Sequence, residues 1–210
     1  MAGRPVHLAT AGGVVTFETG WRGSSAIDDA VAMSTALTVE KYERTIARLR
    51  GRRIRKVAYH PLTVGDDGHD VEDWDFGAWH QPTMGVELST DDGARYSAVW
   101  GSSFDHYGLE VFPEPMTAHL VMNGSAMVDV TEHPGWSPLV GKKLTRTEIV
   151  WSGNHVRVPY AIRLCSRDTV VWIAAGRPAD RPEGGFYLGT DDVMVVLTVE
   201  SAEEVGIPVS

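Results

Sequence analysis

The sequence predicts an α+β fold that is mostly antiparallel β, with two N-terminal helices followed by nearly all of the strands. Three observations support this prediction: a helical spacing of apolar residues before residue 50, short β-like runs after it, and a similarity between residues 49–112 and 139–199. A split barrel, or two packed sheets from a tandem-duplicated β unit, suits such a chain. We expect one compact domain over residues 1–210.

The two similar segments begin with the same short pattern. In residues 49–54 and 139–144 a leucine is followed by a glycine two positions later, then by two cations and an aliphatic residue. Later in each segment come a proline, an apolar run, an aspartate turn and further apolar runs closed by Gly101 and Gly176. Repeats on this scale determine the architecture, although two β-rich stretches can also align by chance.

Two helices are predicted in the N-terminal part, residues 25–50. Ser25 is a candidate N-cap for the first, and two aspartates follow in its first turn. Thr38 is the candidate N-cap of the second, which runs from residue 39 to about residue 50. Its apolar residues recur at spacings of three and four, and Gly51 is a helix stop signal.

Short runs of β-branched and aromatic residues predict strands at residues 13–18, 53–60, 84–90, 94–100 and 107–112. An Asp-Asp-Gly turn joins residues 84–90 and 94–100 into a hairpin. This first copy alternates polar and apolar residues, so one face of its sheet is expected to be wet or to line a polar pocket. Residues 113–138 link the copies and fit either a short helix or short strands.

The second copy is more apolar than the first. Its runs at residues 170–175 and 193–198 do not alternate, which predicts strands covered on both faces. After them, Ser201 and Glu204 have the spacing of a capping box. This pattern predicts a last short helix that ends at Gly206.

Composition narrows the functional classes. The net charge of −9 argues against general nucleic-acid binding. No apolar run is long enough to cross a membrane, and we find no secretory signal. The single cysteine, Cys165, suits a reducing compartment, so we expect a cytoplasmic protein. The sequence does not indicate an oligomeric state.

Charge is divided between two neighbouring blocks. Residues 41–56 are mostly basic, and residues 66–92 carry carboxylates without lysine or arginine. We expect the two blocks to face one another. The alternative is a cationic groove on residues 41–56 that binds a phosphate or an acidic partner.

Residues 62–81 form a long acidic excursion that has only a short counterpart in the second copy. Added loops on a scaffold often carry function. The aspartates between residues 66 and 75 do not have calcium-loop spacing, and His60, His69 and His80 would meet a metal only if the loop folds back. We therefore expect neither a metal nor another cofactor.

Histidines are the best candidates for acid–base chemistry, because imidazole titrates near neutral pH. Alternate loops of an antiparallel sheet share one end, which would bring residues 60–82 close to residues 102–106. The other possibility for each histidine is a surface position without function. The candidate catalytic residues are His60, His80 and His106, with Asp75 and Asp105 to orient them.

Aromatic and cationic residues of the first copy are candidates for substrate binding. Two tryptophans in the polar excursion would suit a lid over a small ligand, and arginines of the first strand would hold an anionic group. The set comprises Trp74, Trp79, Trp100, Tyr59, Arg53 and Arg55.

Two functional classes remain open. The first is a small-molecule-binding β protein that works as a cofactor-independent acid–base enzyme (isomerase, lyase, cyclase or hydrolase), with its pocket in the first copy under residues 62–82. The second is a non-catalytic binding protein, such as an immunity or accessory factor, that covers a basic partner with its acidic loop. A nucleic-acid or membrane partner is not expected.

Overall fold

The computed structural model describes residues 37–64, 70–119, 126–153, 157–180 and 184–209, together with the backbone of two short strands, β1 (Ala9–Thr10) and β2 (Gly13–Val14). The helix expected from Ser25 lies outside the described residues, as does most of the strand expected at residues 13–18. No helix of the described part is long and apolar enough to span a membrane.

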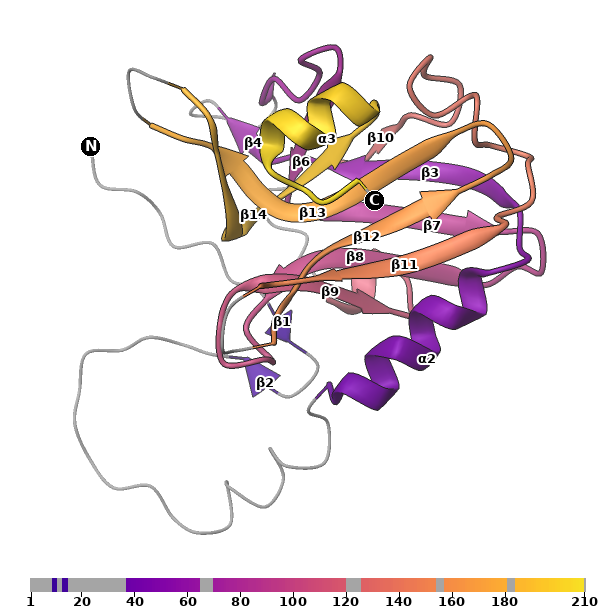
Figure 1. The fold of residues 1–210 in the computed structure, drawn as a ribbon, viewed down its shortest axis with the longest axis horizontal. Coiled ribbons are helices and arrows are strands. Elements are labelled where there is room, and N and C mark those ends of the chain that lie inside the picture. Colours follow the sequence, from indigo (N-terminus) through magenta and orange to yellow (C-terminus); the bar gives the residue numbers. More distant parts are fainter. Residues whose placement is uncertain are drawn as a thin grey trace, which may run out of the picture.

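Two five-stranded antiparallel sheets pack against each other (Figure 1), and within the described residues they do not close into a barrel. The first sheet has the order β10 (Val128–Asp129), β3 (Ile54–His60), β7 (Gly85–Thr90), β8 (Arg95–Gly101) and β9 (Gly108–Phe112). The second has the order β11 (Arg146–Trp151), β12 (Pro159–Cys165), β13 (Val170–Pro178), β14 (Phe186–Val196) and β6 (Trp79–Thr83). A small ladder pairs β4 (Thr63–Val64) with β5 (Asp70–Val71).

The main core lies between the sheets, where alternate residues of both are fully buried. Helix α3 (Val199–Val205) lies over the outer face of the second sheet (Figure 1). Trp172, Ala174 and Met194 are buried on this face. The expectation that β13 and β14 are covered on both faces is therefore confirmed. Helix α3 begins one turn earlier than predicted, because Thr198 is its N-cap and Ser201 lies inside its first turn; Gly206 ends it as expected.

The outer face of the first sheet is wet at one end, where Lys56 and Arg95 are exposed, and covered at the other. Ser97 and Glu110 are buried there, and Val99 and Phe112 pack with Met116 of the short 3-10 helix η1 (Met116–Ala118). Among the described residues of the linker, η1 and β10 are the regular elements. Burial raises the pKa of the Glu110 carboxyl, and the amide N–H of Ser103 hydrogen-bonds to it.

Helix α2 (Val39–Leu49) is present where the apolar spacing predicts it. The Thr38 side chain accepts a hydrogen bond from the Lys41 amide, which caps the helix. The helix packs at the edge of the sandwich, against β9 and β11 (Figure 1). Its apolar stripe of Tyr42, Ile46 and Leu49 is buried. The helix therefore closes one side of the main core.

The basic and acidic blocks meet at one turn. Arg52 forms an ion pair of 3.1 Å with Asp92 in the β7–β8 turn. Lys56, on β3, forms an ion pair with Asp129 on β10. Asp129 does not belong to the acidic block. The two blocks therefore contact each other at the hairpin turn. The acidic residues 66 and 67 lie outside the described part.

Each sheet contains a four-stranded meander in chain order, β3-β7-β8-β9 in one and β11-β12-β13-β14 in the other. The segments that lead into them are bonded reciprocally. Gly51 donates its N–H to the Leu144 carbonyl, and Gly141 donates its N–H to the Ile54 carbonyl, both at 2.8 Å. These residues occupy matching positions in the two similar sequence segments, and both glycines have positive φ, 86° and 76°.

The chain changes sheets between β6 and β7. Thr83 (φ 30°) and Gly85 (φ 152°) make the corner, and the amide of Met84 donates to the His60 carbonyl at 3.1 Å. Strand β6 consequently pairs with β14 of the second sheet, although its sequence neighbour β7 belongs to the first. This corner brings residue 80 of β6 close to residue 59 of β3.

Candidate functional site

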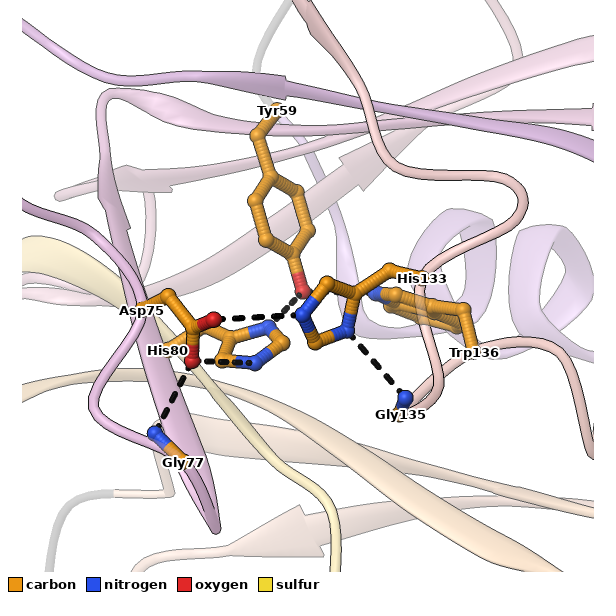
Figure 2. A network of polar contacts seen from close by, with 7 residues as sticks. All are labelled: Tyr59, Asp75, Gly77, His80, His133, Gly135 and Trp136. Atoms are coloured by element: carbon orange, nitrogen blue, oxygen red, sulfur yellow. Dashed lines mark hydrogen bonds and ion pairs between the residues drawn. The ribbon is translucent and has the colours of Figure 1, made fainter.

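Three side chains that can titrate or bind a metal meet at the seam between the two sheets (Figure 2). Asp75 precedes β6, His80 lies on β6, and His133 follows β10 in a series of turns. The Asp75 Oδ1 atom is 3.3 Å from His80 Nε2, and Asp75 Oδ2 is 3.2 Å from His133 Nε2. The three ligand atoms lie within 4.8 Å of one another. We call these three residues the Asp75 cluster.

A tight local turn holds Asp75 opposite His80. The Gly77 amide donates to Asp75 Oδ1 at 2.9 Å, and Gly77 has a positive φ of 85° that favours glycine. The Gln81 amide donates to the Trp74 carbonyl at 2.7 Å, so the chain turns back on itself and forms an antiparallel bridge between residues 75 and 80. Local backbone geometry therefore creates this pair.

His80 is fully buried, and a chain of aromatic residues supports its other ring nitrogen (Figure 2). Trp136 Nε1 donates to the Tyr59 hydroxyl oxygen at 2.6 Å, and that hydroxyl is 2.7 Å from His80 Nδ1. An indole N–H only donates, so Tyr59 accepts from Trp136, and its own O–H is then available to donate to His80 Nδ1. We therefore assign the His80 proton to Nε2, on the side of Asp75.

His133 is held from both sides. The Gly135 amide donates to His133 Nδ1 at 3.1 Å, which leaves the ring proton on Nε2 for the hydrogen bond to Asp75. Its side chain is 23% exposed and that of Asp75 is 45% exposed, whereas His80 has no exposed surface. The cluster thus has a buried side at His80 and an open side at Asp75 and His133.

The surroundings push the pKa values of the cluster apart. The pKa of His80 is lowered to about 4, mainly by burial and also by the neighbouring His133, while Asp75 acts in the opposite direction. The Gly77 amide is the main group that lowers the pKa of Asp75, with a smaller contribution from the His133 hydrogen bond. At neutral pH the cluster therefore combines a carboxylate with a neutral buried imidazole.

The structure brings together two of the five predicted catalytic residues, Asp75 and His80. His60 is buried at the end of β3, and within the described part of the chain neither of its ring nitrogens has a hydrogen-bond partner. Asp105 and His106 lie exposed in the β8–β9 loop, and no hydrogen bond or ion pair among the described residues joins them to the cluster. Strands β7 and β8 separate that loop from β3, so sharing one end of the sheet does not bring these side chains to the cluster.

Of the predicted binding residues, Tyr59 and Trp74 belong to the surroundings of the cluster. The Trp74 ring is edge-on to the rings of Tyr59, His80 and His133 at 5.3, 5.3 and 5.7 Å. It is partly buried and packs against the main core, so it is a wall of the site, which differs from the expected lid.

The other four predicted binding residues lie elsewhere. Trp79 stacks on Phe76 at 4.4 Å on the outer side of the second sheet, and Trp100 contacts Tyr107 on the first sheet. Arg53 and Arg55 are exposed at the opposite end of β3, and Arg53 is about 20 Å along the strand from Tyr59. These arginines therefore do not reach the cluster.

Sequence reasoning missed His133 and Trp136. Both lie in the linker whose pattern was ambiguous, and the pairing of β10 with β3 brings them to the site. The local sequence offers only a turn around Pro134 and Gly135, with no spacing that marks a ligand or a partner of Tyr59. Only this distant strand pairing reveals their role.

Buried His60 makes stability depend on pH. Burial lowers its pKa, so as the pH falls below about 6.5 the unfolded chain binds a proton that the folded chain resists, and stability is lost. Replacing His60 with Phe is expected to reduce the loss between pH 7 and pH 5 by up to about 1.4 kcal/mol per pH unit. Urea unfolding at both pH values measures this, with exposed His106→Gln as the control. An unchanged pH dependence in His60→Phe would contradict the prediction.

Comparison with known proteins gives no match: no family model, no curated protein and no solved structure is similar to this chain. Geometry and chemistry of the site are therefore the basis for a functional proposal.

Proposed function

We propose that the protein binds a small organic molecule at the Asp75 cluster and acts there as an acid–base enzyme. The observation that supports this most is the contrast within the cluster between an exposed carboxylate and a buried, neutral imidazole only 3.3 Å away. Groups that titrate, that lie together and whose pKa values are pushed apart are typical of catalytic sites. The reaction class is an isomerisation, elimination, cyclisation or hydrolysis.

The exposure of the three side chains suggests their roles. Asp75 is the most exposed of them and is the group that a ligand meets first, so it would accept a proton from the ligand and return it to the product. His133 donates its Nε2–H to the same carboxylate and would hold it in place during the transfer. Buried His80 and Tyr59 are positioning residues, because both are tied to the network beneath.

Fluorescence of Trp74 offers a direct test, because its ring contacts two members of the cluster. We expect that at least one compound in a screen of small metabolites changes the tryptophan fluorescence of the protein. The change should disappear in Trp74→Phe, which removes the reporter, and in Asp75→Asn, which removes the charge. It should persist in Asp73→Asn, a neighbouring exposed carboxylate. If no compound gives this pattern, the proposal is wrong.

The alternative is a non-catalytic protein that covers a basic partner. One observation favours it: Phe76 is 49% exposed and Val71 is 38% exposed, close in sequence to exposed Asp70 and Asp73. Apolar side chains rimmed by charge are typical of binding surfaces. Tight binding of a basic protein that is lost in an Asp70→Asn, Asp73→Asn double variant, without any small-molecule response, would reverse our choice.

We also propose that the two meanders derive from one duplicated unit. The shared strand order and the reciprocal bonds of Gly51 and Gly141 support this. A Cβ atom at either position would meet no atom closer than 3.7 Å, so alanine would cost only the strain of a positive φ. Gly51→Ala and Gly141→Ala are each expected to lower the free energy of unfolding by about 1–2 kcal/mol. Clearly unequal losses in urea unfolding would count against structural equivalence.

A further inference from the structure

We propose that the Asp75 cluster binds one divalent transition metal ion through the Asp75 carboxylate and the Nε2 atoms of His80 and His133. The inference deepens the proposed function, on which it rests for its chemical meaning, because it names a partner of the same site. Two imidazole nitrogens and one carboxylate oxygen are a donor set that suits zinc and its neighbours in the first transition row. The sequence alone led us to expect no metal.

The spacing of the donor atoms fits such an ion. A tetrahedral metal with bonds of about 2.0–2.1 Å holds its donors about 3.3 Å apart. Asp75 Oδ1 is 3.3 Å from His80 Nε2 and Asp75 Oδ2 is 3.2 Å from His133 Nε2, so each imidazole lies at this spacing from one carboxylate oxygen. The two imidazole nitrogens lie within 4.8 Å of each other, so binding requires only a small closure between them.

The buried member of the cluster has an unused polar atom that faces the site. His80 has no exposed surface, and its Nε2 lacks a hydrogen-bond partner because the 3.3 Å contact with Asp75 does not have hydrogen-bond geometry. Leaving a buried polar atom unpaired costs free energy, and a metal ion would satisfy it.

Groups behind the ligands would hold them in place. Tyr59 contacts His80 Nδ1, Trp136 fixes Tyr59, and the Gly77 amide fixes Asp75. Such outer hydrogen bonds are a regular feature of metal sites and set ligand orientation. The Tyr59 hydroxyl can rotate so that its oxygen accepts a hydrogen bond from a protonated Nδ1. The His80 proton can therefore move from Nε2 to Nδ1 when the metal binds Nε2.

His133 must make the same change, and this gives the proposal a specific consequence. In the structure its Nδ1 accepts a hydrogen bond from the Gly135 amide. A metal on Nε2 would shift the ring proton to Nδ1, and this hydrogen bond would then be lost. The open side of the cluster at Asp75 and His133 leaves a coordination position for water. In the metal-loaded protein, metal-bound water would replace Asp75, then a metal ligand, as the acid–base group of the proposed function.

Isothermal titration calorimetry tests the proposal: the full chain is dialysed against a chelator and then titrated with Zn²⁺. We expect one Zn²⁺ ion to bind per chain and Mg²⁺ not to bind. Zn²⁺ binding should be lost in Asp75→Asn and in His133→Asn. His106→Asn, which removes an exposed histidine far from the cluster, should bind like the wild type. Tyr59→Phe should weaken binding by about 10- to 100-fold, as expected for a supporting partner of a ligand. The Gly135 amide signal should shift in NMR spectra on loading.

The outcomes separate the two proposals. Absence of one-to-one binding, or binding that survives both Asp75→Asn and His133→Asn, would overturn the metal site. His133 is partly exposed, so circular dichroism of its variant checks that lost binding is not lost folding. Zinc binding without any small-molecule response keeps the metal site and removes the acid–base function. If chelator-treated protein responds to a small molecule but does not bind zinc, the proposed function stands and the metal site is ruled out.

Discussion

Replacing Tyr59 with Phe is expected to lower the free energy of unfolding by about 2–4 kcal/mol, although the change removes one oxygen atom. The hydroxyl accepts from Trp136 Nε1 and contacts His80 Nδ1, and all three residues are buried. Without it, a buried donor and a buried acceptor both lose their partner, and water cannot replace it readily. Each orphaned group costs about 1–3 kcal/mol.

Tyr42→Phe is the matched control for this prediction. Tyr42 is also fully buried, but its hydroxyl has no hydrogen-bond partner among the residues that the structure describes. Its removal is expected to leave stability unchanged or to raise it slightly. In the wild type this hydroxyl loses its hydration on folding and gains no hydrogen bond, and the Phe variant avoids that cost. Urea unfolding at pH 7 measures both variants. Equal losses in the two would show that the Tyr59 network contributes nothing specific.

Gly85→Ala is expected to cost more than about 3 kcal/mol or to prevent folding. A Cβ atom at this corner would lie 2.4 Å from Met116 Cε and 2.5 Å from the Ala98 carbonyl oxygen, and the φ of 152° disfavours any side chain. The methionine can move, but the carbonyl belongs to the backbone of β8 and cannot. Relief of the clash would pull β7 away from β8.

Gly93→Ala provides the comparison. Gly93 also has positive φ, 80°, but a Cβ atom there would meet no atom within 4 Å. Its replacement is expected to cost only about 1 kcal/mol, from backbone strain in the hairpin turn. Thermal unfolding distinguishes the two variants. A Gly85 variant as stable as the Gly93 variant would mean that the corner adapts and is not fixed by packing.

Much of the first sheet was predictable because its signals are local. The apolar stripe and Thr38 cap predicted α2, alternation predicted β3, and the Asp-Asp-Gly turn predicted the β7–β8 hairpin. Each of these patterns reports contacts between residues close in sequence. Asp75 and His80 were named as separate candidates, and the tight turn that pairs them was not predicted.

The rest of the site depends on contacts between distant segments. Strand β6 lies inside the acidic excursion and joins the second sheet, a pairing that no local pattern announces. His133 reaches the cluster because β10 pairs with β3 across a long separation in sequence. Asp105 and His106 were placed near the cluster from loop order alone, which ignores the width of the strands between them.

The state of His80 tests the central claim, that the Asp75 cluster is one coupled polar network, most directly. NMR spectroscopy of ¹⁵N-labelled histidine follows the protonation and the tautomer of each ring as the pH is lowered. In metal-free protein we predict a neutral His80 ring with its proton on Nε2 from pH 7 to near its pKa of about 4, and a change in its signals in Tyr59→Phe. A His80 ring that titrates close to pH 6.5, or that carries its proton on Nδ1, would contradict the network.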